Sequence, residues 1–227
     1  MEGLRTTGAV RQFRPDPIDD DVVERLLDTA RFAPNGGNRQ AWRVVLVRDP
    51  AKKSALRDTY VEGWYEYVAM REAGLTPWAP VTDREAEKAA LRRTGAVARE
   101  AAMGSGFPER LDEVPLLLVL LADLRRLAAA DRDLGRYGRI GGASIYPFAW
   151  SILLAARNEG LGGVLTTVAV RREDAIRRLL GVPDEFAVAG LLALGKPVSQ
   201  PSKLKRLPVS SFASVDAFDG PPLGDGP

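Results

Sequence analysis

The segment Pro34–Gln40 combines two adjacent glycines with three uncharged amide side chains. The glycines let the backbone approach a flat ligand closely, and Asn35, Asn38 and Gln40 offer amide donors and acceptors. Such groups suit the N–H and C=O rim of a heterocycle. A plain turn between a helix and a strand would have the same composition, so both interpretations stay open.

Basic residues gather near both ends of the chain and suit a phosphate group, because a guanidinium pairs with a phosphate through two parallel hydrogen bonds. They are Arg5, Arg11 and Arg14 near the start and Lys203, Lys205 and Arg206 near the end. The two groups can meet only in the folded chain. Any one of them, taken alone, is better explained by solvated surface charge.

A third candidate is the glycine-rich turn that enters a strand at Gly162–Thr167. Such a turn can aim a backbone amide or a threonine hydroxyl at a ligand atom. Glycine turns before strands are common, so this signal is weak by itself.

The sequence contains no Cys and no His. A thiol nucleophile, a Cys-ligated metal, a Ser-His-Asp triad and most zinc sites are therefore excluded. The scattered carboxylates form no catalytic pair that we would name, so we expect no metal and no catalytic side chain. We expect the chemistry to come from a bound cofactor.

Composition indicates a globular chain of 227 residues, with 45% hydrophobic and 27% charged residues. Its net charge of +2 argues against a dedicated nucleic-acid binder. The longest apolar run, Val114–Ala122, is far shorter than the roughly 20 residues of a membrane-spanning helix. The first residues lack the apolar core of a signal peptide, so we expect a cytoplasmic protein without membrane contact.

Periodicity and turn residues predict an α+β or mixed α/β architecture. The expected helices are Asp19–Phe32, Ala51–Val68, Asp83–Ala102, Ser144–Glu159 and Glu173–Leu180. The expected strands are Trp42–Arg48, Leu116–Ala122, Val164–Val170 and Ala187–Leu194.

Two segments fall outside this plain pattern. Residues 63–110 are punctuated by Pro and Gly and are expected to form a lid or insertion. Trp64, Tyr65, Tyr67 and Trp78 lie in or beside it, and packing explains them better than stacking on a flat substrate. The tail 210–227 carries many Pro and Gly, and we expect it to lie on another subunit.

The order of these motifs resembles the nitroreductase-like, flavin mononucleotide (FMN)-dependent oxidoreductases, from about Leu4 to Val209. The most specific motif is ARFAPNGGNRQAW, residues 30–42. It is followed by NEGLGGVLTT at 158–167, AVAGLLALGKP at 187–197 and KLKRLPV at 203–209.

The resemblance implies an α+β fold with a nitroreductase-like mixed sheet flanked by helices, in an intertwined homodimer. It implies one FMN-binding domain over residues 1–209, with the possible lid at 63–110 and the C-terminal tail 210–227. A hydride would pass from NAD(P)H to FMN and then to a small flat electron-poor acceptor, such as a nitroaromatic or quinone.

The resemblance also implies roles for particular residues. Arg11 and Arg206 would bind the FMN phosphate. Asn35, Asn38 and Gln40 would line the isoalloxazine ring and the ribityl chain. The strand residues Leu165, Thr166 and Thr167 would approach flavin N5.

The chain departs from the family pattern at several positions. Where family members commonly carry Arg-Arg-Ser-x-Arg, this chain has Thr7-Gly8-Ala9-Val10-Arg11, so only Arg11 matches. The common Ser of the Pro-Ser loop is Asn35, and the usual Pro before Trp is Ala41. Arg5, Thr6 or Thr7 are possible substitutes at the phosphate.

Two other functions stay open. One is a specialised flavoenzyme, such as a dehydrogenase, a dehalogenase or a flavin-degrading relative. The other is a non-catalytic flavin-binding dimer, which the missing Arg-Arg-Ser run motivates.

Overall fold

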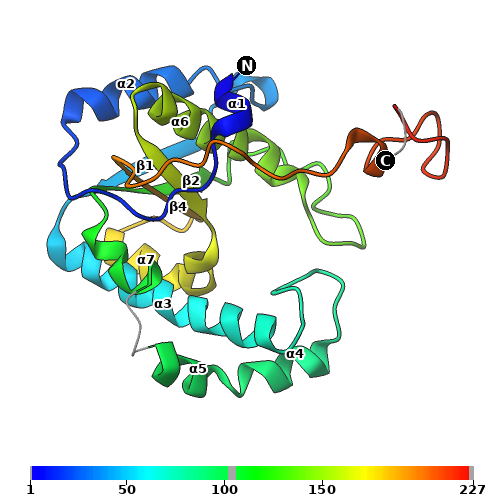
Figure 1. Cartoon of the computed structure of the whole chain (residues 1–227), viewed down its shortest axis with the longest axis horizontal. Coiled ribbons are helices and arrows are strands. Elements are labelled where there is room, and N and C mark those ends of the chain that lie inside the picture. Colours follow the sequence, from blue (N-terminus) through cyan, green and yellow to red (C-terminus); the bar gives the residue numbers. More distant parts are fainter. Residues whose placement is uncertain (1, 102–105, 225–227) are drawn as a thin grey trace.

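The chain folds around one four-stranded sheet in a computed structural model that describes residues 2–101 and 106–224 (Figure 1). The strand order is β1-β2-β4-β3, and every neighbouring pair is antiparallel. The strands are β1 (Trp42–Val47), β2 (Leu116–Asp123), β3 (Gly162–Thr166) and β4 (Phe186–Gly195).

Helices cover both faces of this sheet. The α-helices are α1 (Glu2–Thr6), α2 (Asp20–Ala30), α3 (Pro50–Glu72), α4 (Arg84–Leu91), α5 (Thr94–Ala101), α6 (Tyr146–Asn158) and α7 (Glu173–Leu180). Short 3₁₀ helices are η1 (Gly36–Asn38), η2 (Pro108–Glu113), η3 (Ile140–Ser144), η4 (Val168–Arg172) and η5 (Val209–Ser211). Helices α2 and α6 lie on one face, and α3 and α7 lie on the other (Figure 1). The expected α+β class is confirmed.

The middle strands are buried on both faces, which explains their unbroken apolar sequences. Every residue of β2 is buried. Alternate residues serve the two faces, so Leu118 belongs to the core under α6 and Leu117 to the core under α3. The prediction of a central strand at Leu116–Ala122 is confirmed.

Local sequence signals set several helix ends. Helix α2 follows Asp19 and carries Asp20 and Asp21 in its first turn, where negative charge favours the helix dipole. Helix α6 has Pro147 in its first turn, and Gly181 ends α7 with a left-handed backbone at φ 65°.

Two predicted elements differ from the structure. The strand expected at Val164–Val170 ends at Thr166, and the 3₁₀ turn η4 follows and buries Ala169. The helix expected at Asp83–Ala102 is split, because Arg92 and Arg93 form a turn in which the Thr94 hydroxyl donates to Leu91 O at 2.7 Å. Ala102 itself lies outside the described residues.

The sheet also differs from the expected mixed one. The four strands are purely antiparallel, and parallel pairing within residues 2–101 and 106–224 is confined to the isolated bridge between Ala9 and Gly163. The N-terminal segment pairs with β3 at that one residue, so it forms no fifth strand.

The C-terminal segment, drawn in orange to red, extends away from the body of the molecule (Figure 1). Its residues bond to one another, for example Val215 N to Pro221 O and Leu223 N to Ala213 O. Phe218 is fully exposed. The tail is thus a small folded arm with unburied aromatic side chains.

Candidate functional site

The two basic ends of the chain lie side by side at the outer edge of β3. The Val10 amide donates to Gly163 O at 2.9 Å, which attaches the N-terminal segment to the strand. Arg14 N donates to Lys196 O at 2.8 Å, and Val198 N donates to Gln12 O at 3.0 Å. Two groups of cations that are nearly 200 residues apart in the sequence therefore flank one strand.

A cavity of about 280 Å³ lies where these segments meet β3 and α6. It is lined by Thr7, Gly8, Ala9, Trp150, Leu153, Gly163, Val164, Leu165 and Arg206. The structure thus brings two predicted site residues, Leu165 and Arg206, to one cavity. Sequence reasoning missed Trp150, because the exposure of this aromatic residue, 38%, is visible only in the folded chain.

Arg206 is the positively charged residue that lines this cavity. Its side chain is exposed, and Nη1 donates to Lys205 O at 2.8 Å. The Thr7 hydroxyl donates to Gly3 O at 2.6 Å, so it is already engaged in the N-terminal turn. Thr7 is therefore a poor substitute for the missing family residues.

Arg11 does not line the cavity. Its positive charge acts on the Tyr60 phenol of α3, whose pKa is raised above its ordinary value chiefly by burial and lowered in part by Thr166 and Arg11. The predicted pairing of Arg11 and Arg206 on one phosphate stays a prediction.

The end of β3 presents its residues to both sides of the sheet. Leu165 faces the cavity, and the Thr166 hydroxyl donates to Tyr60 Oη at 3.2 Å on the α3 side. Thr167 is exposed and begins the turn into η4. These three consecutive residues form a corner whose backbone lies at the free edge of the sheet.

The loop 34–40 is a built structure in which Asn35 closes the turn. The backbone N–H of Gln40 donates to Asn35 Oδ1 at 2.9 Å, and Asn35 Nδ2 donates to Ala33 O at 3.2 Å. Gly36 N donates to the Ser144 hydroxyl of η3 at 3.0 Å. The Asn35 side chain therefore stabilises the loop by joining its two ends, a role that the sequence alone does not show.

Asn38 and Gln40 are the exposed amides of this loop. Both have left-handed backbone angles, with φ of 52° at Asn38 and 50° at Gln40. Gly37, directly before Asn38, has a φ of 61°. Non-glycine residues in this region carry strain, which is found most often at ligand sites. The geometry supports a ligand-facing loop more than a plain turn.

Within one chain, this loop and the β3 corner are far apart. Strand register aligns Thr166 with Leu191, Val119 and Val45 across the sheet. Three strand spacings sideways, with the residues of β1 from Val45 back to Trp42 and the two residues before the strand, separate Gln40 from Thr166 by roughly 20 Å. One flat ring cannot contact both within a single chain.

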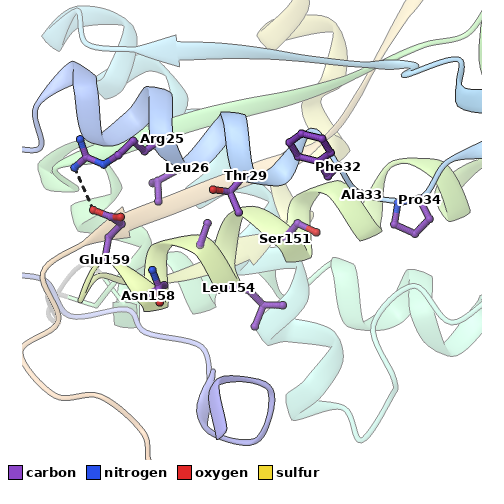
Figure 2. Close-up of a pocket in the computed structure, with 11 residues that line it drawn as sticks. Arg25, Leu26, Thr29, Phe32, Ala33, Pro34, Ser151, Leu154, Asn158 and Glu159 are labelled. Atoms are coloured by element: carbon purple, nitrogen blue, oxygen red, sulfur yellow. Dashed lines mark hydrogen bonds and ion pairs between the residues drawn. The ribbon is translucent and has the colours of Figure 1, made fainter. Parts of the chain in front are cut away.

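Between the helices α2 and α6 lies a second hollow, of about 370 Å³ (Figure 2). Leu26, Phe32 and Leu154 are among its apolar lining, and Arg25 pairs with Glu159 at 3.1 Å at one end. Asn35, Asn38, Gln40 and the β3 corner do not line it. This hollow is an apolar surface feature and offers no group suited to redox chemistry.

The aromatic residues of the 63–110 region pack on one another. The rings of Trp64 and Tyr67 stack with centroids 5.1 Å apart, and Trp78 lies 6.0 Å from Tyr67 with the Arg171 guanidinium over its ring. Tyr65 stands apart and bonds to Glu109 at 3.3 Å. Trp64, Tyr67 and Trp78 therefore pack on one another, and Tyr65 is held by its hydrogen bond.

Comparison with known proteins shows to which family this chain belongs. The sequence model of the nitroreductase family matches residues 4–196. This chain belongs to the nitroreductase family. The resemblance inferred from the motifs is therefore confirmed over residues 4–196, and with it the expectation of an oxidoreductase. The motif at 203–209, which contains Arg206, lies beyond the matched residues.

Two relatives show how varied the family members similar to this chain are. NADH dehydrogenase from Thermus thermophilus is 29% identical over 205 residues, which cover 88% of each chain. A protein named 5,6-dimethylbenzimidazole synthase, from Rhodobacter capsulatus, is 32% identical over 202 residues, covering 86% of this chain and 82% of that one.

The fold of this nitroreductase-family chain is also similar to solved structures. Iodotyrosine deiodinase bound to FMN and 3-iodo-L-tyrosine matches it with a TM-score of 0.63 at 21% identity, over 96% of this chain and 98% of that one. At this identity the similarity concerns the fold. In the described part of the chain, no helix has the length and apolar character needed to cross a bilayer.

Proposed function

We propose that this protein is an FMN-dependent oxidoreductase that takes a hydride from NAD(P)H and passes it to a small flat electron-poor acceptor. The observation that carries the proposal is the cavity beside β3, where a guanidinium, an exposed indole and a glycine-opened strand converge. A family member of similar fold binds FMN, and a relative is named for NADH.

The residues present fit FMN chemically. Arg206 would hold the phosphate through charge-assisted hydrogen bonds. Arg11 would be the second cation of the phosphate site, although it does not line this cavity. Trp150 and Leu153 offer apolar surface, and Leu165–Thr167 offer backbone at the strand edge. The uncharged amides of Asn35, Asn38 and Gln40 suit the polar rim of the ring.

When bound, FMN supplies the acceptance and delivery of the hydride. The chain supplies binding and orientation; because it has neither His nor Cys, it offers no imidazole for proton transfer near neutral pH and no thiol nucleophile. Backbone N–H groups at the β3 corner and nearby cations favour the added negative charge of a reduced ring.

We propose that the site is completed by a second copy of the chain. The cavity of about 280 Å³ contains Arg206 and Leu165 but none of the predicted amides Asn35, Asn38 and Gln40, so one chain offers part of the predicted site. The loop that carries Asn38 and Gln40 lies about 20 Å from Thr166 within its own chain. A partner's loop would bring the missing amides to the ring.

The outward surface of the chain supports a homodimer. Helix α6 is mostly apolar from Tyr146 to Ala156, with Ser151 as the exception, which is typical of a helix covered on more than one side. Tyr146 and Trp150 on its outer side are 43% and 38% exposed, and Phe32 beside the α2–α6 hollow is 74% exposed. The projecting arm 210–224 offers further apolar surface to a partner.

In this proposal residues 1–209 form the FMN-binding domain, and the helices of 63–110 form a lid over the acceptor. A specialised flavoenzyme is the second candidate, because the chain is similar to 5,6-dimethylbenzimidazole synthase and, in fold, to iodotyrosine deiodinase. The lid region would set which acceptor enters.

The test is a visible spectrum of the purified protein after incubation with FMN and gel filtration, followed by NADH or NADPH without oxygen. We expect a yellow protein that bleaches with a nicotinamide. A flavin that stays oxidised with both nicotinamides but accepts electrons from dithionite favours the specialised enzyme. Failure to retain any FMN contradicts the proposal, and a flavin that no donor reduces indicates a non-catalytic binding dimer.

A further inference from the structure

The segment between β2 and η3 ends in an exposed turn, Arg136-Tyr137-Gly138-Arg139. Tyr137 is 70% exposed, so the fold leaves its aromatic ring uncovered. Arg139 is exposed as well, and within the portion of the chain that the structure describes its guanidinium has no hydrogen-bond or ion-pair partner. The turn therefore presents an aromatic ring and a free cation next to each other.

The backbone of this turn is fixed from inside by a buried carboxylate. Asp131 is 3% exposed, and it accepts hydrogen bonds from Arg139 N at 2.6 Å and from Arg136 Nη1 at 2.9 Å. Arg136 Nη1 also donates to Tyr137 O at 2.9 Å. Tyr137 and Arg139 are thus carried by an ordered turn, while their own side chains remain free.

The surroundings of the turn have an excess of positive charge. Residues 124–140 contain five Arg and two Asp. Asp131 is used inside the turn, and the other aspartate, Asp133, is 85% exposed and lies 3.3 Å from Arg132. Such a surplus of cations on one exposed segment attracts an anion from solution.

The turn adjoins the loop 34–40, which carries the exposed amides. The 3₁₀ helix η3 begins directly after Arg139 and ends at Ser144, whose hydroxyl accepts from Gly36 N at 3.0 Å. At about 2.0 Å of rise per residue, Arg139 lies roughly 10 Å from Ser144. A Cβ on Gly36 would lie 3.7 Å from that of Ala128, so the loop 34–40 also contacts the arginine-rich segment.

The chemistry of the turn suits an adenosine phosphate. An exposed aromatic ring stacks on a nucleobase, and a guanidinium pairs with a phosphate through two parallel hydrogen bonds. NADPH differs from NADH by one phosphate on the 2′-oxygen of the adenosine ribose, and an arginine is a residue that accommodates this group.

We propose that this turn binds the adenosine 2′-phosphate of NADPH, with Arg139 on the phosphate and Tyr137 against the adenine. The protein then selects NADPH over NADH. This inference rests on the proposed function, in which the loop 34–40 lines the flavin ring that the nicotinamide must reach.

The experiment compares two adenosine phosphates by titration calorimetry on the FMN-loaded protein. Adenosine 2′,5′-bisphosphate and adenosine 5′-monophosphate differ only in the 2′-phosphate. We expect the first to bind at least about 10-fold more tightly, because a charge-assisted pair contributes about that factor. In Arg139→Gln this preference should be lost, and the ratio of kcat/KM for NADPH to that for NADH should fall about 10-fold.

The matched control is Arg178→Gln, the same loss of one charge on α7, which covers the other face of the sheet. Arg178 is exposed, and its substitution should leave the preference unchanged. Tyr137→Leu should weaken the binding of both adenosine phosphates alike, because both carry the adenine.

A second measurement needs no variant. Raising the ionic strength from about 0.01 M to about 1 M should reduce the wild-type preference for the bisphosphate, because salt screens exposed charges. Equal binding of the two adenosine phosphates by the wild type at low salt overturns the proposal. So does an unchanged preference in folded Arg139→Gln. Either result leaves the proposed function standing if a nicotinamide reduces the flavin, whereas a wild type that retains no FMN overturns that function and this inference with it.

Discussion

Asp131 shows how one carboxylate orders a long arginine-rich loop. It is 3% exposed, and it accepts hydrogen bonds from Arg139 N at 2.6 Å, Ile140 N at 3.2 Å and Arg136 Nη1 at 2.9 Å. These contacts fix the approach to η3, whose Ser144 holds the loop 34–40 through Gly36 N. A residue remote from the cavity thus supports the amide loop.

These donors, with Arg139 N the strongest, hold the pKa of Asp131 below its ordinary value. The charged carboxylate therefore stabilises the fold fully above the unfolded-state pKa of about 3.9, and this contribution is lost as the pH falls through the lower folded-state value.

Asp131→Asn should lower the free energy of unfolding at neutral pH, because the amide replaces an acceptor-only group among three donors. It should also lose less stability than wild type on acidification below about pH 4. Urea unfolding at a series of pH values measures both effects. Asp133→Asn, whose side chain is 85% exposed, is the control and should track wild type. Equal acid sensitivity of wild type and Asp131→Asn would contradict this account.

At the scale of elements, strand β3 owes its position to two glycines. A Cβ on Gly162 would lie 2.7 Å from Val10 Cγ2, where the N-terminal segment crosses the strand. A Cβ on Gly163 would overlap Leu194 Cδ2 and lie 2.8 Å from Ala193 O. The glycines are therefore needed for close packing against the N-terminal segment and β4, which together shape the cavity.

Gly163→Ala should destabilise the protein by about 1–3 kcal/mol, because the neighbouring backbone and Leu194 must shift. For a chain of this size that corresponds to a melting temperature lower by about 2–12 °C, measurable by calorimetry. Gly135→Ala is the control, since its Cβ would meet nothing within 4 Å. An unchanged melting temperature in Gly163→Ala would show that β3 is less tightly packed than described.

Elements with strong local signals could be predicted from the sequence. Helix α7 begins and ends as expected, because its apolar period and the glycine after it are local signals. The end of β3 could not be predicted, because Thr167–Val170 are β-branched or small residues that tertiary contacts turn into η4.

The site shows the same division. The loop 34–40 and the basic ends were identifiable by residue type, whereas Trp150 could not be assigned to the cavity until α6 and β3 are placed side by side. The role of Asn35 within the loop and the contact of Gly36 with Ser144 likewise depend on the folded chain. Partners so distant in sequence leave no local trace.

At the scale of the whole molecule, the account requires two chains for each flavin. Arg206 and the β3 corner belong to one part of a chain, and Asn38 and Gln40 lie about 20 Å away across the sheet. A two-fold dimer would give two equal sites, each with the cation of one copy and the amide loop of the other.

This arrangement can be tested by complementation between two variants. Arg206→Ala removes the cation of the cavity. Asn38→Gly with Gln40→Gly removes both exposed amides without strain, because glycine accepts the positive φ at these positions. Each variant alone should bind FMN more weakly than wild type, by about 10-fold or more for the lost phosphate contact.

The decisive measurement is FMN binding by heterodimers of these two variants, isolated through two different affinity tags and titrated by flavin fluorescence. One site of each heterodimer should be intact and the other doubly altered, so we predict about one FMN per dimer at wild-type affinity. Heterodimers in which every site is weak, or a protein that forms no heterodimers, would contradict the claim that two copies build the flavin site.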